Sequence, residues 1–138
     1  MSGGVTRGRF LVVALAAGIP LGLAPLRPWS VVVAFERAEP AVRLARLLEG
    51  RESARAVGFA YLGTLADPEA SPSALTDAIA LALPGGHRAL ATAGKAELRE
   101  LVAGRTAADF GEDRTLRLRG WILSETEARL CALAALVG

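Results

Sequence analysis

The chain has 138 residues, which is the length of a single domain, and 52% of them are hydrophobic, enough to form a core. Aromatic residues account for only 5%, and the abundance of alanine and leucine favours helices over sheets. The formal net charge is +2, but residues 1–27 contain three arginines and no acidic residue, so the remainder is close to neutral and offers no concentrated basic face for nucleic acid.

Residues 1–28 are predicted to be a signal peptide or a membrane anchor. A polar, basic stretch at residues 1–9 precedes an apolar run at residues 10–24, which is the layout of a secretory signal. The apolar run is shorter than the ~20 residues of a spanning helix, and Pro20 interrupts it. We expect residues 10–24 to contact the membrane at least during export.

The start of this leader resembles a twin-arginine export signal. The family pattern is Ser/Thr-Arg-Arg-x-Phe-Leu, and Gly8 stands where the second arginine belongs. The residues that carry the predicted export signal are Thr6, Arg7, Arg9, Phe10 and Leu11. The resemblance implies export to the periplasm, or to an inner-membrane-anchored position that faces the periplasm.

Three fates of the leader fit the sequence. The first is cleavage between residues 24 and 38, because Gly22-Leu23-Ala24 is a small-x-small site, although Pro25 follows it. The second is retention as an uncleaved membrane anchor. In the third, residues 10–35 form a buried helix and strand of a cytosolic protein.

Residues 29–138 are predicted to form a single helical domain. Apolar residues recur at helical spacing in several segments. Helices are therefore expected at residues 40–49, 51–65, 73–83 and 95–103, the last with an extension towards Phe110. A weaker segment covers residues 87–94, and its His87 is expected in an exposed loop.

Two helices carry more detailed expectations. In the first, the leucines at 44, 47 and 48 face the core, whereas Arg43, Arg46 and Glu49 share the opposite, polar side. In the second, Gly58 lies within the apolar stripe. A glycine there costs about 1 kcal/mol against alanine, and it would let another helix approach closely.

A polar connection and a strand are expected between the helices and the C-terminus. Residues 109–114 mix acidic and basic side chains without the ligand order of a calcium loop, which predicts a solvated turn. Leu116 and Leu118 alternate with Thr115, Arg117 and Arg119, which predicts one half-buried strand over residues 115–123. Such a strand needs a partner, and residues 30–35 are the other strong strand candidate.

The last helix is predicted from residue 124 to residue 137. Ser124 and Glu127 form a capping box at its start. Beyond the box the helix is apolar on all sides, which indicates burial in its own domain or against a partner, with Cys131 as a buried small residue. If it is the core of its own domain, Arg117, Arg119 and Trp121 are the better candidates for contact with a partner.

These elements predict a mainly α fold, a small orthogonal bundle of four to five helices that allows one short β-hairpin or strand pair, after an N-terminal signal or anchor helix. The sequence contains no phosphate-binding loop, dinucleotide fingerprint, HExxH, CxxC or nucleophile elbow. We therefore predict no catalytic residues, no cofactor and no metal. A carboxylate pair assembled by the fold is the remaining route to a small enzyme.

The leader and the Ala/Leu-rich body together resemble the accessory subunits of exported bacterial dehydrogenases, of the gluconate 2-dehydrogenase subunit 3 type. In that family some helices begin with Leu-Ser/Thr-x-x-Glu-Ala, and residues 123–130 are similar to that run. Residues 120–133 are also similar to a run in small proteobacterial proteins with twin-arginine-like leaders. The resemblance implies an exported, non-catalytic accessory or chaperone-like subunit that binds a larger periplasmic oxidoreductase. The alternatives are a membrane-anchored structural or assembly protein and a small enzyme with a carboxylate site.

Overall fold

The computed structural model describes residues 39–138. The leader predicted at residues 1–28, with its export signal, and the strand candidate at residues 30–35 lie outside the described residues. None of the helices within residues 39–138 has both the length and the apolar character needed to cross a membrane.

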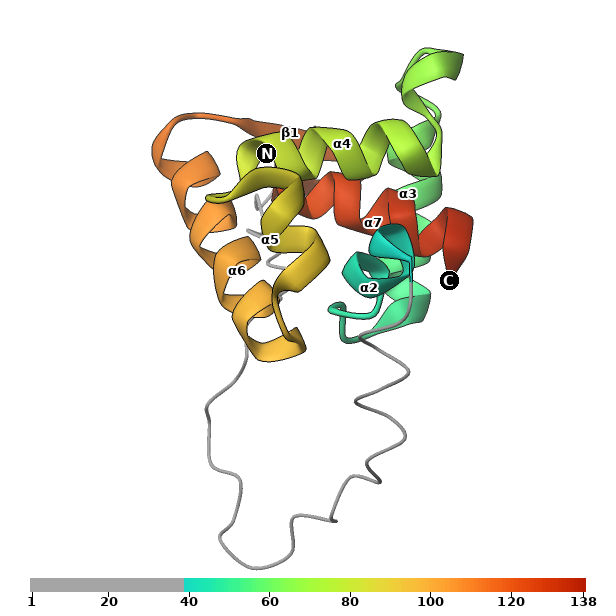
Figure 1. Ribbon diagram of the computed structural model, residues 1–138. Coiled ribbons are helices and arrows are strands. Elements are labelled where there is room, and N and C mark those ends of the chain that lie inside the picture. Colours follow the sequence, from blue (N-terminus) through green and yellow to red (C-terminus); the bar gives the residue numbers. More distant parts are fainter. Residues whose placement is uncertain (1–38) are drawn as a thin grey trace, which may run out of the picture.

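The described part of the chain is mainly helical with one short strand pair, as predicted. Its elements in chain order are α2 (Pro40–Ala45), α3 (Arg51–Leu62), η1 (Asp67–Glu69), α4 (Pro72–Ala82), α5 (Gly86–Thr92), α6 (Lys95–Gly111), β1 (Thr115–Leu118), β2 (Trp121–Ser124) and α7 (Glu125–Val137). Figure 1 shows the other helices grouped around α7, which is drawn in red.

Helix α7 is the centre of the core. It packs against α2, α3, α4 and α6, and Leu130, Cys131 and Leu133 are fully buried. Its last turn reaches the surface at Leu136. The apolar character on all sides of α7 is thus explained by its own domain, because four helices each cover part of its circumference.

Helices α3 and α7 pack at backbone contact. A Cβ atom built on Gly58 would lie 2.0 Å from the carbonyl oxygen of Cys131, a distance too short for any side chain. The close approach that the sequence predicted at Gly58 is confirmed. It fixes the spacing between the central helix and the helix with which it makes its most extensive contact.

The single strand predicted at residues 115–123 is wrong, because the segment folds back on itself. Strands β1 and β2 pair antiparallel, with Leu118 opposite Trp121. The two residues between them, Arg119 and Gly120, have φ angles of 49° and 81°. Positive φ at both positions is the geometry of a type I′ turn, whose twist matches that of the flanking strands.

The predicted polar side of the first helix is wrong at Arg43. This side chain is only 3% exposed, and its guanidinium donates hydrogen bonds to the backbone carbonyls of Leu90 and Ala93 at the end of α5. The last carbonyls of a helix lack partners within that helix, so a cation is favourable there. Helix α2 itself ends at Ala45, earlier than predicted.

The remaining helices lie close to their predicted ranges. The loop predicted at His87 is wrong, because this segment forms helix α5, but the side chain of His87 is exposed as expected, with its Nε2 3.4 Å from the carboxylate of Asp77. Helix α6 is continuous through Gly104 to Gly111. It therefore carries Asp109 into the core, which positions the polar site described next.

Candidate functional site

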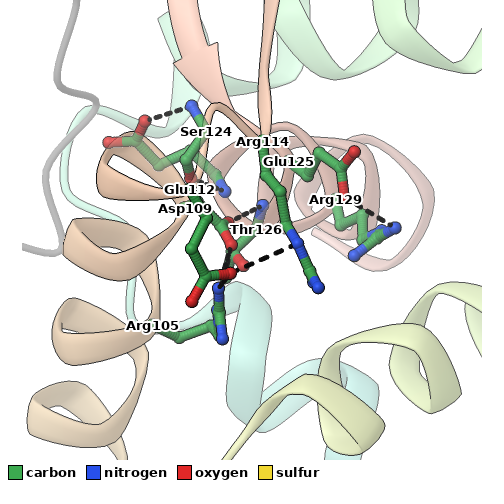
Figure 2. Close-up of polar contacts among 9 residues, drawn as sticks. Arg105, Asp109, Glu112, Arg114, Ser124, Glu125, Thr126 and Arg129 are labelled. Atoms are coloured by element: carbon green, nitrogen blue, oxygen red, sulfur yellow. Dashed lines mark hydrogen bonds and ion pairs between the residues drawn. The ribbon is translucent and has the colours of Figure 1, made fainter.

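A buried carboxylate joins α6 to the start of α7. The side chain of Asp109 is 2% exposed, and its Oδ2 accepts a hydrogen bond of 3.0 Å from the backbone N–H of Thr126 (Figure 2). Its Oδ1 accepts from Nε of Arg105 at 2.9 Å. The prediction of a solvated turn is therefore wrong at Asp109, although Glu112, Asp113 and Arg114 are exposed as expected.

Arg105 continues this contact into a surface network. Its guanidinium lies 2.8 Å from Oε2 of Glu112, and the same carboxylate oxygen is 3.3 Å from Nε of Arg114. Hydrogen bonds to Glu112 and then to Asp109 raise the pKa of Arg105, against the opposing effect of burial. Two arginines and two carboxylates thus neutralise each other where α6 meets the hairpin.

All of the first-turn donors of α7 are satisfied within the domain. The predicted capping box is present, with the Glu127 N–H donating to Ser124 Oγ at 2.9 Å and the Ser124 N–H donating to Glu127 Oε2 at 3.0 Å. The Glu125 N–H donates to the backbone carbonyl of Arg114 at 3.0 Å. Together with Asp109, these bonds complete the start of the helix and hold it against α6.

The carboxylates gathered at this junction are the closest match to the carboxylate pair considered from the sequence. Both oxygens of Asp109 are engaged as hydrogen-bond acceptors, one by a backbone N–H and one by a guanidinium. Their observed role is to cap α7 and to pair with arginine. Within residues 39–138, no three His, Cys, Asp or Glu side chains lie together in a way that could hold a metal ion.

A second feature is a surface hollow between α3 and the β-hairpin, which we call the α3–hairpin hollow. Arg119 and Trp121 line it from the hairpin, and Ser53, Ala56 and Val57 line it from α3, around a volume of about 320 Å³. One helical turn along α3 from Ala56, the side chain of Phe59 is 56% exposed. The hollow thus carries one large aromatic side chain and a guanidinium, and α3, which forms its other wall, exposes a second aromatic side chain at Phe59.

The structure separates the three residues predicted to contact a partner. Arg119 and Trp121 line the same hollow. Arg117 pairs with Ile122, one position along β1 from the Leu118–Trp121 pair, and successive residues of a strand point to opposite faces. Arg117 is therefore on the other face of the hairpin.

Sequence reasoning missed the contribution of α3 to this surface. The apolar stripe of α3 predicts which residues face the core, and the residues at 54, 57, 58 and 61 are buried as expected. Phe59 lies outside that stripe. An aromatic residue on the outward face of an amphipathic helix was the signal that could have revealed it.

Cys131 and its surroundings are as predicted, because the thiol is fully buried. Burial raises its pKa to about 12, with a smaller contribution from the charge of Glu127. The thiolate is the reactive form of cysteine, so this side chain is chemically protected while the domain is folded.

The fold and its surface define a class of molecule, a small helical domain around one central helix, with aromatic and arginine side chains presented beside a β-hairpin. Comparison of the chain with family models, with curated proteins and with solved structures gives no match.

Proposed function

We propose that this protein is an exported, non-catalytic accessory subunit that binds a larger periplasmic oxidoreductase. The observation that carries the proposal is the α3–hairpin hollow with exposed Phe59 beside it. Tryptophan and arginine are enriched among the residues that contribute most to protein–protein affinity, and they act best beside apolar neighbours that exclude water. Arg119 and Trp121 supply this combination in the hollow, and Phe59 adds an exposed aromatic side chain on the helix that forms its other wall.

The surface is also held on rigid elements, which supports a binding role. Helix α3 is fixed against α7 at Gly58, the residue before Phe59. Strand β2 runs directly into the capped start of α7, three residues after Trp121. A partner that docks here does not have to order the backbone first, so less of the interaction free energy is lost on binding.

The export part of the proposal comes from residues 1–28, whose basic stretch and apolar run are those of a secretory signal. The resemblance to twin-arginine leaders and to dehydrogenase accessory subunits favours a partner that is exported already folded. The leader is then either removed or retained as a membrane anchor, and the domain faces the periplasm in both cases.

Fractionation and co-purification test both parts. The full chain with a C-terminal tag is expressed in its own host, and the tagged protein is recovered from the periplasmic and inner-membrane fractions. We expect a larger oxidoreductase to co-purify with it in constant ratio. N-terminal sequencing then distinguishes a cleaved leader from an anchor. Recovery from the cytoplasm would contradict the export proposal.

Two substitutions test the hollow as the binding site, with circular dichroism of each variant confirming that the domain is folded, because Trp121 also packs against the core. Trp121→Ala removes the largest side chain of the hollow, and Arg119→Asn removes its guanidinium while placing a residue that tolerates positive φ in the turn. Both are expected to reduce the recovery of the partner at least about tenfold, as hot-spot truncations do. Leu81→Ala, at an exposed position on α4 that does not line the hollow, is the matched control. Equal recovery by all variants would reject this surface as the binding site.

A further inference from the structure

A second hollow lies where α2, α3 and the end of α7 meet, and we call it the arginine hollow. Its volume is about 300 Å³, at the lower end of the range for small-ligand sites. Apolar residues of α2 and α7 line it together with three exposed arginines, Arg46, Arg51 and Arg55. Within residues 39–138, none of these three guanidinium groups forms an ion pair or a side-chain hydrogen bond.

The positions of these arginines are unfavourable for the local structure. Arg51 is the first residue of α3, where the positive end of the helix dipole disfavours a cation. Arg51 and Arg55 are four residues apart on the same helix, and like charges at that spacing repel each other. Glu52 in the first turn of α3 is the acidic residue next to these arginines in the chain, and Glu49, before α3, lies 4.0 Å from Arg99 on another helix. Proteins tolerate such unfavourable charge positions mainly at sites where another interaction compensates for them.

The domain itself supplies only part of that compensation. The end of α7 contributes Gly138 to the lining of the hollow. The negative end of a helix dipole amounts to about half a unit charge. Three guanidinium groups therefore leave an excess of positive charge in a hollow whose remaining walls are apolar.

We propose that the arginine hollow binds a phosphate-type anion. Arginine presents planar pairs of N–H donors that match the oxygens of phosphate, and three arginines line this hollow, one directly after α2 and two on α3. The uncapped start of α3 adds the positive end of its dipole at the same place. The phosphate group belongs either to a free phosphorylated molecule or to the headgroup of an anionic phospholipid. This inference does not depend on the oxidoreductase partner proposed above.

The test compares two single substitutions that remove the same charge. Arg55→Gln alters the arginine hollow, whereas Arg88→Gln alters an exposed arginine on α5 that does not line it. The full chain is titrated with inorganic phosphate at constant ionic strength, and the amide shifts of α2 and α3 are followed by NMR. In a second arm, the same proteins are mixed with vesicles of phosphatidylcholine with or without phosphatidylglycerol. The leader is identical in all of them, so differences report the hollow.

We expect Arg55→Gln to weaken binding about two- to fivefold, as removal of one partly exposed ion pair would, and Arg88→Gln to leave it unchanged. Arg46→Gln, Arg51→Gln and Arg55→Gln together should abolish it, with the helical CD signal retained. An effect with inorganic phosphate identifies a free anion, and an effect with anionic vesicles alone identifies a lipid headgroup. Equal behaviour of the Arg55→Gln and Arg88→Gln proteins in both arms, or no binding by the wild type, would overturn the proposal.

Discussion

Asp109 connects three parts of the chain through one residue. Its side chain accepts from the Thr126 N–H at the start of α7 and from Arg105 on its own helix. Its backbone carbonyl accepts from the Arg114 N–H at 2.8 Å, where the chain turns towards the hairpin. The relative positions of α6, the hairpin and α7 therefore depend on a side chain that is almost completely buried.

Replacing Asp109 with alanine is expected to destabilise the domain by about 2 kcal/mol. About half of this is the loss of a cap on the Thr126 N–H, and the rest is the loss of the bond to Arg105. Urea unfolding followed by circular dichroism measures the change. Glu100→Ala, at an exposed carboxylate on the same helix, is the control and should change the free energy of unfolding by less than about 0.5 kcal/mol. Equal effects of the two substitutions would show that Asp109 does not have this role.

The sequence revealed the buried capping box, whose partners are three residues apart, but not the buried polar residues whose partners lie far along the chain. Asp109 stands among other charged residues, and its acceptor role depends on a backbone N–H 17 positions away. Arg43 falls on the polar side of a helical wheel, but the carbonyls it binds are 47 and 50 positions away. Periodicity describes one element at a time, so partners at this separation are invisible to it.

At the scale of elements, helices α3 and α7 approach until their backbones touch. Alanine is the better helix former by about 1 kcal/mol, and at most helical glycines it would be stabilising. At Gly58 the added methyl group would meet the Cys131 carbonyl, and the two helices would have to separate. Here the packing effect is larger than the propensity effect.

We therefore predict opposite effects for the same substitution at two glycines. Gly58→Ala should destabilise the domain by about 2 kcal/mol or more, because overpacking displaces the backbone of α7. Gly104→Ala, in the exposed interior of α6 with nothing within 4 Å of the added atom, should stabilise it by up to about 1 kcal/mol. Thermal unfolding of the two variants and the wild type shows whether each substitution raises or lowers the stability of the domain. Stabilisation by Gly58→Ala would show that the helices can separate without cost.

The turn of the hairpin is the part of the secondary structure that the sequence pattern did not predict. Apolar and polar residues alternate from Thr115 to Arg119, and apolar residues follow Gly120, so the segment indicated one strand that continues through the turn. An Asn-Gly pair would have signalled a type I′ turn, whereas Arg-Gly shares only the glycine. Helices α3, α4 and α6, in contrast, lie near their predicted ranges because each has one stripe of core residues and a glycine or proline near an end.

For the whole molecule, the sequence predicted that α7 is buried, but it did not predict the surface that the other elements form around it. The burial of α7 follows from its capping box and its apolar circumference. The α3–hairpin hollow could be predicted only in its hairpin half, because the other half comes from a helix about 60 positions earlier in the chain. The fold class is thus encoded locally, whereas the candidate binding surface arises from packing.

Because Cys131 lies at the centre of the core, its thiol should report unfolding of the whole domain. We expect no reaction with a thiol reagent at pH 8 in the native state and complete reaction in urea, along the same curve as circular dichroism. Cys131→Ala combined with Ala91→Cys, at an exposed position on α5, should react at once and is the control. Rapid labelling of native Cys131 would show that α7 opens locally.

The same thiol makes stability depend on alkaline pH. Its pKa is raised from 9.0 to about 12 in the folded state, so the unfolded chain releases this proton first. The stability that the protonated Cys131 thiol contributes is fully present below pH 9. It is lost as the pH rises from 9 towards 12. Cys131→Ala should remove this part of the alkaline destabilisation, which urea titrations at pH 8 and pH 10.5 can measure.

Ser124 belongs to two elements at once, because it is the last residue of β2 and the N-cap of α7. No linker separates the hairpin from the central helix. The direction of strand β2 is therefore fixed by the axis of α7. An inserted residue at this junction would turn every strand side chain to the opposite face. We therefore expect the chain to tolerate changes of length in its other connections more readily than at this one. The orientation of Trp121, on the same strand, depends on the position of α7 in the core.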